Sequence, residues 1–595
     1  MTPLKTRSPQ PSHPHVGRWQ ARDFAAAAGL FLATAAVVLW QNAHVAVLWD
    51  ASYTLDSAMR IALGQMPYRD FPFAHAPLTF LIQAAIIRLT GRVYFHHVLY
   101  AAVMGGLGTV LAWRILLRSL RLRVRFAFAI ALLLAAPLTF LGLYSILPFP
   151  SYDCDCCLAI LAAVWCLQRL DTTPADPPVA RWRGFAAGCA ICLPLFVKQN
   201  MGLPFLIAAM GSVALLLCSN LLRREKSEAD RVSATTLFAV LAGASITCLA
   251  ALLLLHFTAG IGNYIHWTIR FAAQRRLPGL PVMAGIYSDP SLRWTLPAVA
   301  AALILLMWRR TSGPLVPIAA FLLLAAPFFF ALSALFLYYD DPDSFGDTLM
   351  TLWPLLMLLA AAHVVRNLIR FRNLALLSFL PLILLAAIHG TMLSQQLWGS
   401  TYAIWPLLAI LIADLLVFLA GFPSLAANRW FLPSLASLVS VTLLVCGAFY
   451  TVSEERLSYV SIPAGPVDHS AFPQLARAST PGPYLPELDA FLRYAAANIP
   501  QNDGLILLPG EDPFYFVTGR VPQFPVLLFD KATDPCSPEE TAALVRARNI
   551  RWLVVKRDLQ IKEDVTPNRA ATLELLLGEF SPAAHLRGYD IYKRP

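Results

Sequence analysis

Long apolar runs, separated by short polar connections, fill most of the first 450 residues of the chain. Each run has about 18–22 residues, the length at which a helix crosses a hydrocarbon core about 30 Å thick. The runs and their flanking Arg and Lys residues predict about thirteen membrane-spanning helices. We expect these helices to begin near residues 24, 94, 126, 154, 184, 202, 235, 294, 314, 349, 373, 403 and 430.

The pattern changes near residue 451. A stretch with helical periodicity, LPELDAFLRYAAANI, is followed by short apolar runs typical of strands, namely GLILLP, FPVLLF and IRWLVVKR. Because Pro, Gly and Asp separate these elements, the segment predicts a small α/β domain outside the membrane. The chain therefore divides into an N-terminal tail (1–23), a transmembrane domain (24–450) and a C-terminal domain (451–595).

Basic and acidic residues alternate from one connection to the next. The N-terminal tail contains Lys5, Arg7, Arg18 and Arg22, and later connections on the same side are also rich in Arg. The alternate connections are mostly acidic or uncharged. Since Arg and Lys accumulate in cytoplasmic loops, the tail is predicted to be cytoplasmic. An odd number of spans then places the C-terminal domain on the outer face.

The composition agrees with this class of protein. Of the 595 residues, 58% are hydrophobic and 14% are charged, and the mean hydropathy is +0.60. We attribute the net charge of +11 to cytoplasmic connections, because no basic segment interleaved with aromatics indicates nucleic-acid binding. The first apolar run, about 24–46, is too long for a cleavable signal peptide and is interpreted as an uncleaved first span.

Two short clusters contain residue types that can bind a metal ion. DCDCC, residues 153–157, lacks the paired CxxC spacing of a zinc site and is interpreted as a membrane-interface turn followed by a span. YYDDPDSFGD, residues 338–347, lacks the spacing of an EF-hand loop and is interpreted as a polar turn or an acceptor-facing loop. No metal or other cofactor is predicted, and a divalent cation is the less favoured alternative.

The connection at 47–93 concentrates ionisable residues immediately after the first span. It contains WDASYTLDSAMRIALGQMPYRDFPFAHAP, residues 49–77. Acidic groups beside a span are candidates for function, and Asp50 is either a functional group or the N-cap of the helix that follows. Asp56 and Arg60 have the spacing of a surface ion pair on that helix.

The same helix is predicted to end at Gly64, with a turn at Pro67. The next segment, HAPLTFLIQAAIIRLTG, is apolar but short. It suits a helix lying in the membrane interface better than another span.

The order of residues in this loop resembles the first external loop of the GT-C glycosyltransferases. The matching features are a span, an acidic residue, an aromatic, a helix ending in G-x-x-P-Y-R-D-F, and a small residue before P-L. More narrowly, the loop is similar to that of the bacterial protein mannosyltransferases, aminoarabinose transferases and rhizobial RgtA-like enzymes. The motif covers about thirty residues, whereas the likeness in architecture covers most of the chain.

The resemblance implies an inner-membrane enzyme that takes a sugar from a polyprenyl-phosphate carrier on the outer face and inverts the anomeric centre. In the family the acidic residue of this loop is the expected catalytic base, and that position matches Asp50. Many relatives have Asp-Glu where this chain has Asp50-Ala51, which disfavours metal-assisted and two-carboxylate versions of the mechanism. The candidate substrate-binding residues of the loop are Tyr53, Asp56, Arg69, Asp70 and His75.

Two further segments contribute candidates. Lys198, in PLFVKQNMGLPF, lies at a predicted external turn, where it either holds a phosphate with Gln199 and Asn200 or snorkels to the interface. The external segment 259–293 is basic, against the usual charge rule, and contributes three candidates for binding lipid phosphates. These are Arg270, Arg275 and Arg276; the alternative is a helix that only solvates its polar face.

These features predict a polytopic α-helical, GT-C-like membrane glycosyltransferase. Its expected partners are a polyprenyl-phosphate-linked sugar, membrane lipids, and a lipid, glycan or protein acceptor. A polymerase or ligase for lipid-linked glycans is one alternative. A transporter is another, although paired Gly/Pro-broken spans in two matching halves are not evident.

Overall fold

The computed structural model describes most of the chain. The described ranges are 19–44, 48–121, 123–145, 147–170, 177–222, 232–276, 284–307, 315–337, 349–369, 375–393, 403–426, 428–452, 466–530, 533–560 and 569–595. Within them a helix begins near each of the predicted span starts. The largest difference is at α8, which begins at Pro177 rather than near residue 184, because its first turns contain Arg181 and Arg183 and escape a hydropathy criterion.

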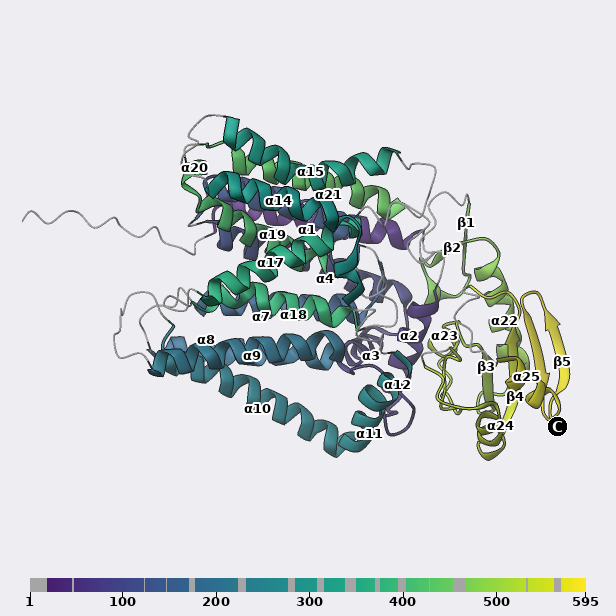
Figure 1. The fold of residues 1–595 in the computed structure, drawn as a ribbon. Helices are drawn as coiled ribbons and strands as arrows, with labels where there is room; N and C mark the ends of the chain where they lie inside the picture. Colours follow the sequence, from purple (N-terminus) through teal and green to yellow (C-terminus); the bar gives the residue numbers. More distant parts are fainter. Residues whose placement is uncertain are drawn as a thin grey trace, which may run out of the picture.

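The apolar helices form one bundle (Figure 1). Its longer members are α1 (Ala21–Asn42), α4 (Tyr94–Leu120), α7 (Tyr152–Leu170), α8 (Pro177–Val197), α9 (Gln199–Leu222), α10 (Ala234–Thr258), α15 (Leu315–Leu337), α17 (Leu352–Ile369) and α21 (Phe431–Val452). Shorter apolar helices are α14 (Leu292–Met307), α18 (Leu380–Thr391) and α19 (Trp405–Ala420). The span expected near residue 126 is divided into α5 (Ala127–Ala135) and α6 (Leu138–Leu141). Pro137 lies between them, because proline has no amide hydrogen to continue the helical hydrogen bonds.

Eight helices of the described part are long and apolar enough to cross a membrane. The remaining predicted spans are shorter, interrupted or carry more charge. The predicted fold class, a polytopic helical membrane protein with a small C-terminal unit containing a sheet, is confirmed. The interfacial segment after the first span also forms a short apolar helix, α3 (Leu78–Thr90).

The C-terminal unit combines helices with a four-stranded sheet of order β3-β4-β6-β5. β3 (Gly504–Leu508) and β4 (Ile550–Lys556) are parallel, and the hairpin of β5 (Ser581–Leu586) and β6 (Tyr589–Lys593) adds antiparallel to β4. The other elements are β1 (Val467–His469), β2 (Ser479–Pro481), α22 (Tyr484–Asn498), α23 (Phe514–Thr518), α24 (Pro538–Ala547) and α25 (Arg569–Leu577). The predicted helix LPELDAFLRYAAANI is α22, and GLILLP and IRWLVVKR are β3 and β4.

The prediction of a strand at FPVLLF is wrong. Residues 524–529 have no regular structure, and Phe524, Val526 and Phe529 are buried in the core of the C-terminal unit. Pro525 lacks the amide hydrogen that a central strand needs. An apolar run of this length therefore signalled burial rather than a strand.

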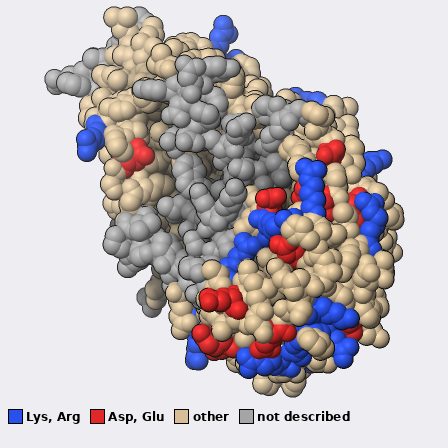
Figure 2. All heavy atoms as spheres, turned by 90° about the vertical axis from the view of Figure 1, so that its right-hand side faces the viewer, with Lys and Arg blue, Asp and Glu red and all other residues tan. Residues whose placement is uncertain are grey.

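The C-terminal unit lies at one end of the bundle, next to α2 (Trp49–Ala62) and α3 (Figure 1). Viewed from that end, Lys, Arg, Asp and Glu side chains are interspersed over its surface (Figure 2). A mixed charged surface of this kind is typical of contact with water. α2 is therefore placed between the apolar bundle and a polar domain.

Two glycines shape the surroundings of α2 and α9. Gly64 has a φ of +97° directly after α2, a conformation that favours glycine, and the predicted end of this helix is confirmed. In α18, a Cβ at Gly390 would lie 2.4 Å from the carbonyl oxygen of Asn200. Only glycine lets α18 approach the first turn of α9 so closely.

Candidate active site

The first turn of α2 carries Asp50. The helix begins at Trp49, with Leu48 at the N-cap position and no side-chain cap. Asp50 is exposed within this turn. The alternative interpretation of Asp50 as the N-cap is wrong, because the helix starts before it. A carboxylate in a first turn is favoured by the helix dipole, and an exposed one is accessible to a substrate hydroxyl.

Asp56 and Arg60 do not form the expected surface pair. Both are buried, with 4% and 1% of their surfaces exposed, and each bonds to the backbone of the C-terminal unit. The carboxylate of Asp56 accepts the N–H groups of Tyr515 (3.3 Å) and Phe516 (2.7 Å). Arg60 donates to the carbonyl oxygens of residues 524 and 525. Because they are four residues apart, Asp56 and Arg60 lie on the same face of α2, and both attach this helix to the C-terminal unit.

Neighbouring side chains extend this attachment. Gln65 donates to the carbonyl oxygen of Pro522 (3.2 Å), and Arg92 donates to those of Phe516 (3.1 Å) and Val517 (2.8 Å). These bonds involve backbone groups of irregular segments and helix ends, which must be satisfied when buried. The C-terminal unit is consequently fastened along α2 rather than joined to the bundle only by its linker.

The docking contact at Asp56 is expected to make stability depend on pH. Burial raises the pKa of Asp56 from 3.8 to about 8, although the two amide N–H groups and Arg60 oppose the rise. Between about pH 4 and pH 8 the folded state holds a proton that the unfolded state has released. Stability therefore falls as the pH rises through this window, with a limiting slope of about 1.4 kcal/mol per pH unit. We expect the Tm of the purified protein to fall between pH 5 and pH 8, and that of Asp56→Asn to fall less.

The matched control for this experiment is Asp468→Asn, which changes an exposed carboxylate on β1. In this variant, Tm should fall with pH as steeply as it does in the wild type. Other buried acids such as Glu511, whose pKa burial also raises, contribute to the slope in all three proteins. If the Tm of Asp56→Asn fell with pH as steeply as that of the wild type, Asp56 would be ionised over the whole range from pH 5 to pH 8.

A series of ring contacts crosses the site from α2 to α9. Tyr53 lies one turn after Asp50, and its ring centroid is 5.6 Å from that of His75. His75 stacks on Tyr152, with centroids 4.6 Å apart. The Nζ atom of Lys198 lies 5.3 Å from the Tyr152 ring centroid. The structure therefore brings together three predicted residues, Tyr53, His75 and Lys198, from separate segments.

Lys198 is buried and forms an ion pair with Asp153. It occupies the break between α8 and α9, and Asp153 lies in the first turn of α7. Only 7% and 9% of the two side chains are exposed. A lysine buried against a carboxylate does not fit the snorkelling alternative. The cation nevertheless stands in the same group of side chains as Tyr152 and His75.

Sequence reasoning missed the roles of the two acidic residues of DCDCC. α7 already begins at Tyr152, so Asp153 and Asp155 lie inside its first turn and are buried, rather than forming an interface turn. Asp155 accepts hydrogen bonds from Thr79 (2.7 Å), Tyr100 (2.8 Å) and Tyr144. The available signal was two carboxylates in the first turn of an apolar helix, which are costly unless they have partners.

The side-chain amide of Gln199 forms hydrogen bonds with the protein backbone. Its Nε2 donates to the carbonyl oxygens of Ala74 (3.0 Å) and Thr268 (3.2 Å), and its Oε1 accepts from the N–H of Ala76 (3.2 Å). These bonds fix the two residues that flank His75. The geometry indicates that Gln199 orients the loop, whereas the sequence suggested contact with substrate.

Arg69 and Asp70 form an exposed ion pair, with Nε and Oδ1 2.9 Å apart. The hydrogen bond from Arg69 lowers the pKa of Asp70. Asp70 also accepts the N–H of Met66 (2.7 Å), and Arg69 donates to the carbonyl oxygen of Thr258 at the end of α10 (3.3 Å). The pair therefore closes the turn after α2, and a contact of either residue with substrate stays a prediction.

The basic candidates lie on a neighbouring segment. Arg270 is exposed in the π-helix η1 (His266–Phe271), which follows α11 (Ile261–Ile265). Arg275 and Arg276 belong to α12 (Ala272–Arg276), and their side chains lie outside the described part of the structure. The acidic segment 338–347 also lies outside the described residues.

A cleft of about 460 Å³ is lined both by residues of α2 and the turn after it and by residues of the C-terminal unit. It is lined by Arg60, Gln65, Asp70, Gln523 and Arg548, among others. A cavity of about 10 Å³ between Tyr53, Ser57 and residues 525–528 has room for about one water molecule. Among the described residues, no group of three His, Cys, Asp or Glu side chains is arranged to hold a metal ion.

Comparison with known proteins returned solved structures only. No protein-family model matches the chain, and neither does any curated protein sequence. ArnT from Cupriavidus metallidurans, crystallised with undecaprenyl phosphate, is similar with 15% identity and a TM-score of 0.45 over 96% of this chain and 98% of ArnT. The oligosaccharyltransferase AglB from Archaeoglobus fulgidus, in complex with an inhibitory peptide and a dolichol-phosphate, has 12% identity and a TM-score of 0.42 over 90% of this chain and 69% of AglB. Both are proteins of the kind that the first-loop motif led us to expect.

Proposed function

We propose that the protein is an integral-membrane glycosyltransferase that moves a sugar from a polyprenyl-phosphate donor to an acceptor. The reaction would take place on the outer face of the cytoplasmic membrane, on the side of the C-terminal unit. The observation that carries this proposal is the contact series Tyr53–His75–Tyr152–Lys198. It connects the turn that bears an exposed carboxylate with a buried cation at the end of the apolar bundle.

The two charges have complementary uses in glycosyl transfer. Asp50 would take the proton of the acceptor hydroxyl as its oxygen attacks the anomeric carbon. The bond between that carbon and the phosphate oxygen breaks on the opposite face, so the configuration inverts. The leaving group is the polyprenyl phosphate, and Lys198 would stabilise the negative charge that develops on it.

The surrounding residues would arrange these groups. Tyr53 and His75 offer ring faces and polar atoms close to the turn that bears Asp50, and Gln199 holds the backbone on both sides of His75. Arg270 would meet the lipid phosphate or neighbouring headgroups from its exposed position. Asp56 would act in docking of the C-terminal unit, since amide groups of that unit occupy its carboxylate.

The proposal is tested by identifying the lipid that the protein carries. The protein is purified from membranes in mild detergent, and bound lipids are released and measured by mass spectrometry. We expect a polyprenyl phosphate bearing one sugar, and transfer of that sugar when candidate acceptors are added. The sugar found would also define the donor for all later assays.

Three other outcomes would contradict the proposal. A polyprenyl pyrophosphate bearing an oligosaccharide would instead indicate a polymerase or ligase. Accumulation of a solute in vesicles without formation of a product would indicate a transporter. Absence of any polyprenyl lipid, together with no turnover of undecaprenyl-phosphate-linked mannose, glucose or galacturonic acid as probe donors, would rule out the donor class.

A further inference from the structure

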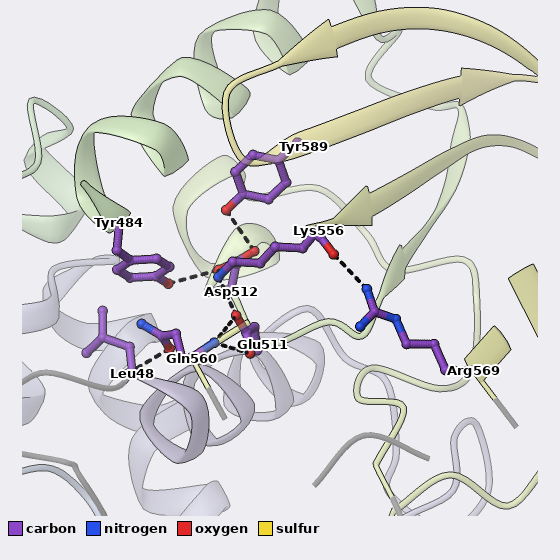
Figure 3. Close-up of polar contacts among 8 residues, drawn as sticks. All are labelled: Leu48, Tyr484, Glu511, Asp512, Lys556, Gln560, Arg569 and Tyr589. Atoms are coloured by element: carbon purple, nitrogen blue, oxygen red, sulfur yellow. Dashed lines mark hydrogen bonds and ion pairs between the residues drawn. The ribbon is translucent and has the colours of Figure 1, made fainter. Parts of the chain in front are cut away.

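A buried ionic network lies in the C-terminal unit beside α2 (Figure 3). Lys556, at the end of β4, pairs with Glu511 and with Asp512, whose Oδ1 is 2.9 Å from Nζ. The side chains of the three residues are only 5%, 0% and 7% exposed. Two carboxylates and one ammonium group are costly to bury, so every polar atom needs a partner.

Tyrosines complete the network around Asp512. Tyr484 donates to its Oδ1 (2.9 Å) and Tyr589 to its Oδ2 (3.0 Å). The ammonium of Lys556 also lies 4.3 Å from the Tyr484 ring centroid. The two carboxylates raise the pKa of Lys556 against the effect of burial, and it stays charged. A buried network with its bonds made is rigid, because any shift breaks several bonds in a low-dielectric environment.

The network reaches the candidate active site through one side chain. Both oxygens of Glu511 accept the backbone N–H of Gln560, at 3.1 and 3.3 Å. The Oε1 atom of Gln560 accepts the N–H of Leu48 (3.1 Å). Figure 3 shows Gln560 between Glu511 and Leu48. Leu48 is the N-cap residue of α2 and precedes Asp50 by two positions.

A second bond holds the preceding helix end. Ser479, on β2, donates its hydroxyl to the carbonyl oxygen of Ala43 (2.6 Å), the C-cap residue of α1. The C-terminal unit therefore bonds to the chain immediately after α1 and immediately before α2. The side chain of Leu48 makes no capping hydrogen bond, and its carbonyl accepts the first helical bond from Ser52 (2.6 Å). The position of Leu48 thus defines the path of the turn that carries Asp50.

We propose that Gln560 is a positioning residue for Asp50, held in place by Glu511 and the buried Lys556 network. This inference rests on the proposed function, in which Asp50 is the base. The bond from Leu48 to Gln560 fixes the start of α2 against a rigid part of another domain. Without it the first turn of α2 frays, and the Asp50 carboxylate samples orientations that do not reach the acceptor hydroxyl.

The experiment uses the full-length protein in detergent and three variants. Gln560→Ala removes the acceptor of the Leu48 N–H. Gln560→Glu keeps an oxygen atom that can accept the Leu48 N–H. The Nε2 atom that this change removes has no hydrogen-bond partner among the described residues, so no other bond is lost. The control, Gln501→Ala, removes an exposed glutamine of the same domain.

Hydrogen–deuterium exchange gives the first measurement. In Gln560→Ala, the amides of Leu48 and Ser52 should exchange about fivefold faster, the change expected for losing one hydrogen bond. Amides in the last turns of α2, which Asp56 and Arg60 hold, should exchange as in the wild type. Gln560→Glu should restore most of the protection, and Gln501→Ala should leave it unchanged.

Turnover gives the second measurement, with undecaprenyl-phosphate-linked mannose as the probe donor or with the lipid-linked sugar that mass spectrometry of the purified protein detects. We expect kcat to fall about 10–100-fold in Gln560→Ala, with the KM for the donor unchanged. Unchanged exchange at Leu48 and Ser52, or faster exchange across the whole C-terminal unit, would overturn the positioning role. If no variant and not even the wild type transfers sugar, the proposed function fails, whereas the exchange data still decide whether Gln560 orders the turn.

Discussion

Replacing Asp50 by Asn is expected to lower the turnover of sugar transfer by about 10²–10⁴-fold, the range associated with loss of a general base. Asn has nearly the same shape as Asp and suits the same exposed position in the first turn of α2. It cannot accept the proton of an attacking hydroxyl. The KM for the donor should change little, because Asp50 acts on the acceptor rather than on the lipid phosphate.

The measurement is single-turnover transfer with the lipid donor found in the purified protein. Asp468→Asn, an exposed carboxylate on β1, serves as the matched control and should retain wild-type turnover. Wild-type turnover by the Asn variant would remove Asp50 from the role of base.

The apolar helices could be predicted well because their signal is local. A run of about 20 apolar residues can satisfy its backbone in a membrane only as a helix, whatever the rest of the chain does. Thus α4 begins at Tyr94, the position expected, and α21 begins one residue from its predicted start. Predictions deviated where local composition was ambiguous, as at the charged start of α8 and at Pro137 between α5 and α6.

The end of α2 at Gly64 could also be predicted, but its N-cap residue and the partners of its charged residues could not. Asp56 bonds to amides of residues 515 and 516, and Arg60 to carbonyls of residues 524 and 525. No local sequence pattern predicts contacts between residues that are more than 450 positions apart in the chain. The general tendency of opposite charges four residues apart to pair on a helix surface therefore predicted an exposed ion pair. In the structure, both residues instead contact the C-terminal unit.

The same limit applies to the buried cation. Lys198 could be selected from the sequence because it interrupts an apolar run, yet its partner Asp153 belongs to another helix. Metal-ligand spacing in the DCDCC cluster says nothing about its carboxylates, whereas the cost of burying a carboxylate in an apolar helix does. Applied to Asp153 and Asp155, that criterion predicts one or more buried partners, although it cannot say which.

Replacing Lys198 by Met is expected to weaken binding of undecaprenyl phosphate about 10–100-fold, the value of one hydrogen bond to a charged group. The same change leaves Asp153 buried without its cation, which destabilises the protein by about 3–5 kcal/mol. A loss of binding by this variant alone would not separate the two effects. Thermal unfolding and lipid binding must therefore be measured on the same samples.

The double variant Lys198→Met/Asp153→Asn separates them. It removes both charges from a site in which Tyr152 and His75 remain stacked, so stability should return close to that of the wild type. If Lys198 binds the lipid phosphate, the double variant is stable but still binds undecaprenyl phosphate weakly. If Lys198 serves only to neutralise Asp153, binding returns together with stability. Asp153→Asn alone should bind the lipid at least as tightly as the wild type, because the phosphate no longer competes with a carboxylate for the same ammonium group.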